Sequence, residues 1–189
     1  SADERARIDR AAAQLLAGPR DLASIREWRH DGYAAGFHIL STLIRRTFDG
    51  SPDLRIEGVR GLLEAITHEV LTTYAVAARV LDDVAPRCVL VEEANYALNG
   101  PLVDVAVARG VDVIDTKATW RDDAWISKRL RAGNRRVDAR SVAPETLERL
   151  ATQGGFPPDE RLDDELEADF GRRYDGTWSL SAQNQPGTR

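Results

Sequence analysis

The sequence predicts an α/β protein with a Rossmann-like parallel sheet and one long amphipathic helix. Apolar residues recur every seven positions from Ile56 to Val84, which is typical of a helix with one apolar face. A continuous apolar run at 88–91 and a second strand pattern at 111–114 flank a helical pattern of about ten residues. Because a strand, a helix and a strand in this order form a βαβ unit, the two strands are expected to be parallel.

The composition is that of a globular protein with a hydrophobic core. Of 189 residues, 42% are hydrophobic and 30% are charged. No apolar run approaches the roughly 18 residues of a membrane span, and no signal segment opens the chain. The single cysteine allows no internal disulfide, so a cytoplasmic location is expected. The net charge of −5 argues against nucleic acid as a partner.

Three helices are expected before the long one. The first covers 3–16 and stops at Gly18. Asp21 then caps a short helix that reaches Trp28, because its side chain can accept from free N–H groups in the first turn. Apolar residues spaced by three and four predict the third helix over 33–48.

The long helix is the most regular feature of the chain. A helix of about 30 residues would measure about 45 Å at 1.5 Å per residue. Leu62, Tyr74 and Leu81 widen its apolar stripe beyond a coiled-coil seam. We therefore expect the helix to pack against a sheet or against other helices.

The sheet is expected to begin directly after this helix. The run 88–91 is continuously apolar, as in a strand covered on both faces, so Cys88 is expected to be an inert core residue. Pro101 is suited to the first turn of the next helix, and Gly110 ends that helix before the strand at 111–114.

The chain is expected to divide into three parts. Residues 1–27 form an N-terminal helical segment, and 28–157 form the Rossmann-like α/β domain. Residues 158–189 form an acidic C-terminal extension that ends in a flexible tail, since the last residues are polar and marked by glycine and proline.

Side chains suited to substrate binding follow the first predicted strand, where ligands of open α/β sheets bind. A carboxylate at Glu93 could take a proton from a substrate hydroxyl or amine. Asn95, Tyr96 and Asn99 could shape a pocket for a polyhydroxylated or amino-acid-like ligand. The alternative is that Glu93 is an ordinary loop carboxylate and that the asparagines cap the next helix.

Cationic residues dominate the chain after the second strand. Lys117 and Arg121 follow that strand, and 121–140 hold seven cations against three acids. Guanidinium groups bind oxyanions through paired donors, so this stretch could hold a phosphate, a sulfate or an acidic protein surface. In a transferase subunit, Lys117 or Arg121 would face the anionic group of the donor. A solvated helix face is the alternative, and the acidic stretch 158–175 could neutralise the charge.

The three histidines and the absence of known motifs limit the kinds of site that the sequence predicts. His30 lies beside arginine and aspartate near a helix start, so it is either a recognition residue or a surface residue. The three histidines and the cysteine lack metal-ligand spacing, so no metal is expected. No glycine-rich phosphate loop, GxGxxG or G-x-S-x-G motif occurs, so a nucleotide-type donor has no evident place in this chain.

Several motifs together resemble a known family. They include Trp28, the long helix ending at Pro86, Glu93-Ala94-Asn95-Tyr96, Asn99-Gly100-Pro101-Leu102, Gly110-Val111 and the segment 141–150. The pattern, which extends over residues 24–176, resembles the N-terminal, acceptor-side domain of capsular-polysaccharide-type glycosyltransferases of the GT-B architecture. In that architecture a second domain mostly binds the activated donor, and this sequence ends where that domain would begin.

The resemblance implies an acceptor-side subunit of a two-component group transferase in a biosynthetic pathway. Glu93 would be its catalytic residue, and a separate chain would bind a nucleotide-type donor. Asn95, Tyr96, Asn99 and His30 would bind the acceptor. Three alternatives stay open: an excised domain, a sulfuryl or phosphoryl transferase subunit, and a non-catalytic scaffold whose basic stretch binds an acidic partner such as a carrier protein.

Overall fold

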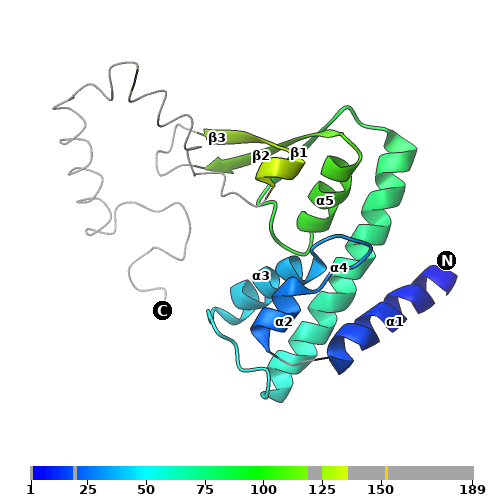
Figure 1. The fold of residues 1–189 in the computed structure, drawn as a ribbon, viewed down its shortest axis with the longest axis vertical. Helices are drawn as coiled ribbons and strands as arrows, with labels where there is room; N and C mark the ends of the chain where they lie inside the picture. The colour runs from blue at the N-terminus through cyan, green and yellow to red at the C-terminus, as the bar shows by residue number, and fades with distance from the viewer. Residues whose placement is uncertain (1, 19–20, 119–124, 136–151, 153–189) are drawn as a thin grey trace. The chain divides into compact units, whose positions relative to one another are not determined.

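The computed structural model describes residues 2–18, 21–118, 125–135 and 152. The chain divides into two compact units, and the helices and the candidate site belong to the first, Ser1–Lys117 with Ser127–Val137. Along the chain the elements are α1 (Ala2–Ala17), α2 (Leu22–Glu27), α3 (Ala35–Thr47), α4 (Glu57–Val84), β1 (Cys88–Glu92), α5 (Gly100–Ala108), β2 (Asp112–Ala118), β3 (Trp125–Leu130) and the 3-10 helix η1 (Ala132–Asn134) (Figure 1).

The first three helices form where the sequence predicts them. α2 begins after Asp21, whose Oδ1 accepts a hydrogen bond from the backbone N–H of Ser24 at 2.8 Å, so the predicted cap is confirmed.

Within 2–18, 21–118 and 125–135, no helix has both the length and the hydropathy that a membrane span requires. The predicted C-terminal extension lies outside the described residues.

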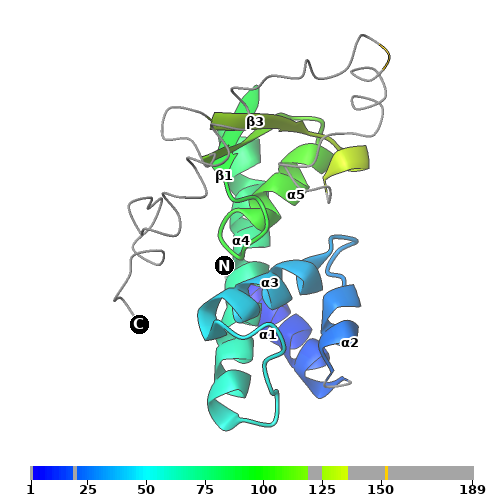
Figure 2. The ribbon, with the colours of Figure 1, turned by 90° about the vertical axis from the view of Figure 1, so that its left-hand side faces the viewer.

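The long helix α4 organises the unit, and α1, α3 and α5 all pack along it. Figures 1 and 2 show α2 and α3 beside its N-terminal half and α5 beside its C-terminal half. Its length of 28 residues and its packing against helices confirm the prediction. The ends of the seven-residue repeat, Ile56 and Val84, are nevertheless exposed. A strict repeat of seven drifts by about 20° per heptad on a straight helix, so only the middle of the stripe faces the core.

A small sheet of three strands follows, in the order β1-β2-β3. β1 and β2 are parallel, with Cys88 opposite Asp112 and Glu92 opposite Thr116, so the predicted strand–helix–strand unit with parallel strands is confirmed. The mixed α/β class is therefore confirmed as well.

The expectation that β1 is covered on both faces is wrong. Val91 is only 7% exposed, whereas Leu90 is 70% exposed and Cys88 lies at the surface. α5 contacts β1, but none of the described elements covers the face that carries Cys88 and Leu90. Cys88 is therefore not a core residue.

Candidate functional site

A buried polar cluster lies beneath the loop that follows β1. Asp104 of α5 is its centre: Oδ2 lies 2.9 Å from His38 Nε2 and accepts from the Tyr74 hydroxyl at 2.9 Å, and Oδ1 accepts from Arg135 Nε at 2.8 Å. All four side chains are buried. One carboxylate thus connects α3, α4, α5 and the residue after η1, and each polar group has a partner, as burial requires.

The cluster also fixes the backbone of residues 93–99. His38 Nδ1 lies 2.9 Å from the carbonyl oxygen of Asn95, and Arg135 Nη2 donates to the carbonyl of Ala94 at 2.7 Å. The backbone N–H of Ala97 donates to Thr42 Oγ1 at 2.9 Å. These interior contacts hold the backbone of the loop in place, so they also fix the positions from which its side chains extend.

Glu93, the first residue of this loop, has an unusual backbone conformation. Its φ is 62°, in the left-handed region that side-chain-bearing residues rarely adopt. Arg45 Nη1 donates to Glu93 Oε1 at 3.2 Å and to the Tyr96 hydroxyl oxygen at 3.3 Å, and the guanidinium lies 4.8 Å from the centre of the Tyr96 ring. The hydrogen bond to Tyr96 and the charge of Glu93 raise the pKa of Arg45 above its ordinary value.

These residues line an open pocket of about 510 Å³, which we call the β1 pocket. A second ion pair, Arg46 with Glu69 at 2.8 Å, lies at the same pocket, and Phe48 at its rim is 81% exposed. The lining residues are Thr42, Arg45, Arg46, Phe48, Glu69, Glu93, Tyr96, Ala97, Leu98 and Asn99. Carboxylates, guanidinium groups and exposed rings together suit a hydroxyl-rich ligand with one apolar face.

The structure thus brings Glu93, Tyr96 and Asn99 to one pocket. Asn99 stands at the N-cap position of α5, but its side chain makes no cap hydrogen bond and donates to the Glu92 carbonyl at 2.7 Å instead. Asn95 is not among the lining residues, and its Oδ1 accepts from Arg135 Nη1 at 3.4 Å.

Two other predicted site residues within the described part of the chain, Lys117 and His30, do not line the β1 pocket. Lys117 Nζ is paired with Asp115 Oδ1 at 3.3 Å, and Arg121 lies outside the described residues. His30 exchanges two backbone hydrogen bonds with Tyr33, and its ring stacks on Trp28 at a centroid separation of 6.1 Å. Burial lowers the pKa of His30, with the charge of Asp31 opposing the shift and that of Arg7 reinforcing it.

The cationic stretch is likewise only partly available to a ligand. Arg135 is buried on Asp104, and Arg129 is paired with Asp112. The prediction that this stretch forms a solvated or partner-binding face is therefore wrong for Arg135, because a buried carboxylate competes for its guanidinium.

Sequence reasoning missed His38, Arg45, Asp104 and Arg135 as contributors to the site. A signal existed for Asp104, the one charged residue in α5, whose sequence is otherwise apolar (GPLVDVAVA). A carboxylate on a helix buried on several sides needs cationic or hydroxyl partners. No local pattern identifies those partners, since they lie 66, 30 and 31 positions away along the chain.

The described residues hold no group of three or more His, Cys, Asp or Glu side chains that could bind a metal ion. Comparison of the chain with protein-family models, with curated proteins and with solved structures finds no match.

Proposed function

We propose that this chain is the acceptor-side subunit of a two-component, glycosyltransferase-like group transferase, and that the β1 pocket holds the acceptor. One observation carries the proposal: Glu93 is held in a left-handed conformation at the carboxyl end of β1, where its carboxylate and the Tyr96 hydroxyl share the Arg45 guanidinium at an open pocket. Strained residues of this kind cluster at functional sites, where the surrounding structure enforces them.

The chemistry of the pocket supports an acceptor that bears hydroxyl groups. The Glu93 carboxylate, which is paired with Arg45, can accept a hydrogen bond from a hydroxyl and orient its oxygen for attack. Tyr96 and Phe48 offer flat surfaces for the apolar face of a sugar ring. In the proposal, a separate chain supplies the activated nucleotide-type donor, and together the two chains form the equivalent of a GT-B enzyme.

No described contact favours the alternatives over this proposal. A scaffold that grips an acidic carrier needs free cations, but Arg135 and Arg129 are bound to carboxylates of this chain. A phosphoryl or sulfuryl transferase subunit needs cations facing the site, and the guanidinium groups of the β1 pocket are engaged with Glu93 and Glu69.

The test begins with affinity purification of the chain from its native cell extract. The expected companion is stoichiometric and carries a nucleotide-binding domain. In the reconstituted pair, Glu93→Gln is expected to lower turnover by about 100-fold or more while the complex still forms. Glu92→Gln, at an exposed neighbour that does not line the pocket, is the matched control. Unchanged turnover with Glu93→Gln would exclude the role of Glu93, and recovery of the chain alone would contradict the two-chain proposal.

A further inference from the structure

Both ring nitrogens of His38 face oxygen atoms that accept hydrogen bonds. Nδ1 lies 2.9 Å from the backbone carbonyl oxygen of Asn95, and Nε2 lies 2.9 Å from the carboxylate oxygen Oδ2 of Asp104. A neutral imidazole has one N–H donor and one acceptor nitrogen, whereas a protonated imidazole donates from both nitrogens. Only the protonated ring can therefore hold the Asn95 carbonyl and the Asp104 carboxylate at the same time.

The His38 ring has no room to avoid either oxygen. Its side chain is 0% exposed and lies against the first turn of α5, where a Cβ atom at Gly100 would be 2.2 Å from Nδ1 and 2.4 Å from Cε1. The ring of Phe37 meets the imidazole edge to face at a centroid separation of 5.6 Å. A neutral ring would keep one nitrogen lone pair pointing at an oxygen, and neither rotation nor surface water would relieve that contact.

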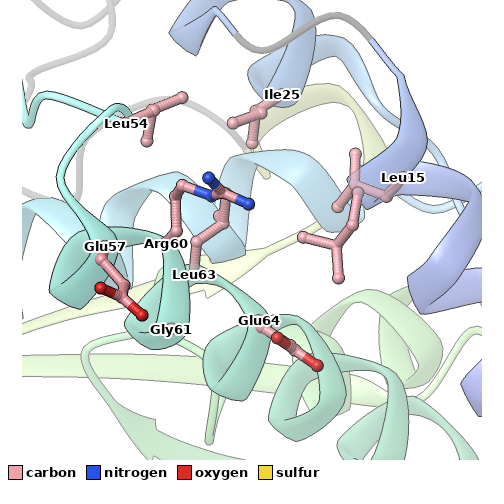
Figure 3. A pocket seen from close by; sticks show the side chains of 9 residues that line it. Leu15, Ile25, Leu54, Glu57, Arg60, Gly61, Leu63 and Glu64 are labelled. Atoms are coloured by element: carbon pink, nitrogen blue, oxygen red, sulfur yellow. The ribbon is translucent and has the colours of Figure 1, made fainter.

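Charged groups that line a hollow open to solvent differ from His38 in this respect. The hollow of about 470 Å³ between α1, α2 and α4 (Figure 3) carries three charged residues of α4, all of them exposed: Glu57, Arg60 and Glu64. Water can hydrate such groups without help from a protein partner. The protonation of His38, in contrast, is coupled to its two contacts inside the protein.

Three ionisable side chains from other elements surround the imidazole. Asp104 of α5 contacts it directly, and the same carboxylate accepts from Tyr74 of α4 and from Arg135 after η1. His30 lies one layer further out, with its ring 6.2 Å from that of Tyr74. Because histidine is the side chain that ordinarily changes charge near neutral pH, a test must separate His38 from His30.

We propose that His38 is a proton-dependent latch on the loop 93–99. When the ring is protonated, Nδ1 donates to the Asn95 carbonyl and Nε2 donates to Asp104. When one proton is lost to solvent, the remaining proton stays on Nε2, because a hydrogen bond to a carboxylate is roughly twice as strong as one to a neutral carbonyl. The Nδ1 lone pair then repels the Asn95 carbonyl, so the latch is closed at lower pH and opens as the pH rises.

Two other contacts hold the same loop without a histidine. Arg135 Nη2 donates to the carbonyl of Ala94 at 2.7 Å, and Thr42 Oγ1 accepts from the backbone N–H of Ala97 at 2.9 Å. A guanidinium group and an aliphatic hydroxyl do not change charge near neutral pH. Opening of the latch is therefore confined to the middle of the loop, around Asn95.

The middle of the loop also carries Tyr96, so the latch bears on the β1 pocket. The Tyr96 hydroxyl shares the guanidinium of Arg45 with Glu93. A shift of the peptide group between Asn95 and Tyr96 moves this hydroxyl relative to Arg45, so the pocket is expected to be better ordered at lower pH. The inference does not depend on the transferase proposal, because the loop and its contacts need neither an acceptor nor a partner chain.

The test follows single peptide groups of the ¹⁵N-labelled full chain by nuclear magnetic resonance between about pH 5 and about pH 9. The N–H of Tyr96 belongs to the same peptide group as the Asn95 carbonyl, so its ¹⁵N shift reports the hydrogen bond from His38. This shift is expected to change with the same midpoint as the His38 ring signals. The N–H of Asn95 shares a peptide group with the Ala94 carbonyl, which Arg135 holds, and is expected to change little.

A matched pair of variants separates the two ring nitrogens. The side-chain amide of asparagine places a donor near the position of Nδ1, and that of glutamine places one near the position of Nε2. His38→Asn is expected to keep the Tyr96 signal at its low-pH position throughout, whereas His38→Gln is expected to keep it at the high-pH position. His30→Phe removes the neighbouring histidine and is expected to leave the native response unchanged.

The measurement on the native chain is decisive even if a His38 variant proves unfolded by circular dichroism. A Tyr96 signal that stays constant while the His38 ring changes protonation would overturn the proposal. So would a His38 ring whose protonation is the same from about pH 5 to about pH 9. A Tyr96 response that persists in both folded His38 variants, or that disappears in His30→Phe, would assign the effect to another group and overturn it as well.

Discussion

The imidazole Nε2 of His38 lies 2.9 Å from the carboxylate of Asp104, and both side chains are buried. The same carboxylate accepts from the Tyr74 hydroxyl and from Arg135 Nε, so one acidic group holds three elements and the residue after η1 together. Because His38 and Arg135 also reach the carbonyl oxygens of Asn95 and Ala94, this cluster sets the position of the loop that carries Glu93.

Asp104→Ala is expected to destabilise the protein by about 3 to 5 kcal/mol, because it leaves the buried guanidinium of Arg135 without its carboxylate. Asp82→Ala is the control, since it removes the carboxylate of an Arg–Asp pair at the surface, where solvent screens the interaction and little stability is lost. Urea denaturation compares the free energies of unfolding. Similar small losses in both variants would mean that the buried cluster contributes no more than a surface pair.

Gly100→Ala is expected to destabilise the protein by about 1 to 3 kcal/mol through overpacking. The new Cβ would lie 2.2 Å from Nδ1 of the fully buried His38, which has no space to move away. Gly58→Ala is matched to it, because Gly58 also lies in the first turn of a helix but a Cβ there meets nothing within 4 Å. Thermal unfolding should show a lower midpoint for Gly100→Ala and an equal or higher one for Gly58→Ala. Equal midpoints would contradict the close packing of His38 on α5.

Most of the fold could be predicted because its signals are local. The repeat of α4, the Asp21 cap and the placement of Pro101 in the first turn of α5 depend on residues within one or two turns of each other. The burial of β1 could not be predicted from the sequence, because a run of four apolar residues is found both in strands covered on one face and in strands covered on two. Its exposed face at Leu90 is a property of the tertiary structure.

The candidate site was predictable in part for the same reason. Glu93, Tyr96 and Asn99 were found because they follow a strand, and a sequence rule places ligands there. Arg45 reaches Glu93 from 48 positions away, and no pattern in the chain connects the two. Asn95 was predicted to bind a ligand, but its carbonyl and amide oxygens face His38 and Arg135.

The Cys88 thiol is expected to react with Ellman's reagent in the native protein. The residue is exposed on the uncovered face of β1, so the reagent can reach its sulfur without unfolding. The measurement is the rate of colour formation with and without urea, with Cys88→Ser as the blank. If the thiol reacted with the reagent only after urea had unfolded the chain, Cys88 would be a buried core residue, contrary to this prediction.

The stability of the protein is expected to fall with acid partly through His30. Burial lowers the pKa of His30 in the folded chain below its ordinary value of 6.5. The unfolded chain therefore binds a proton at a higher pH than the folded chain does. The stability that the neutral His30 ring contributes to the folded chain is fully present above about pH 6.5. It is lost as the pH falls through the lowered pKa of the folded chain.

His30→Phe keeps a ring against Trp28 but removes this titration. The free energy of unfolding, measured between about pH 7 and pH 5, is expected to fall more steeply in the native sequence than in the variant. Parallel curves would mean that His30 titrates alike in the folded and unfolded chains.

Replacing Glu93 by glycine is expected to leave a more stable protein than replacing it by alanine. Both changes remove the carboxylate and its ion pair with Arg45, so they differ only in the cost of the left-handed backbone. Glycine adopts a φ of 62° without strain, whereas alanine is penalised by about 1 kcal/mol. Urea denaturation of the two variants measures this difference, and equal stabilities would show that the chain does not enforce the conformation. A glutamate at a position where glycine is the more stable residue is best explained by a use for its carboxylate. In the proposed complex both variants are therefore expected to lose transfer activity, whichever is the more stable.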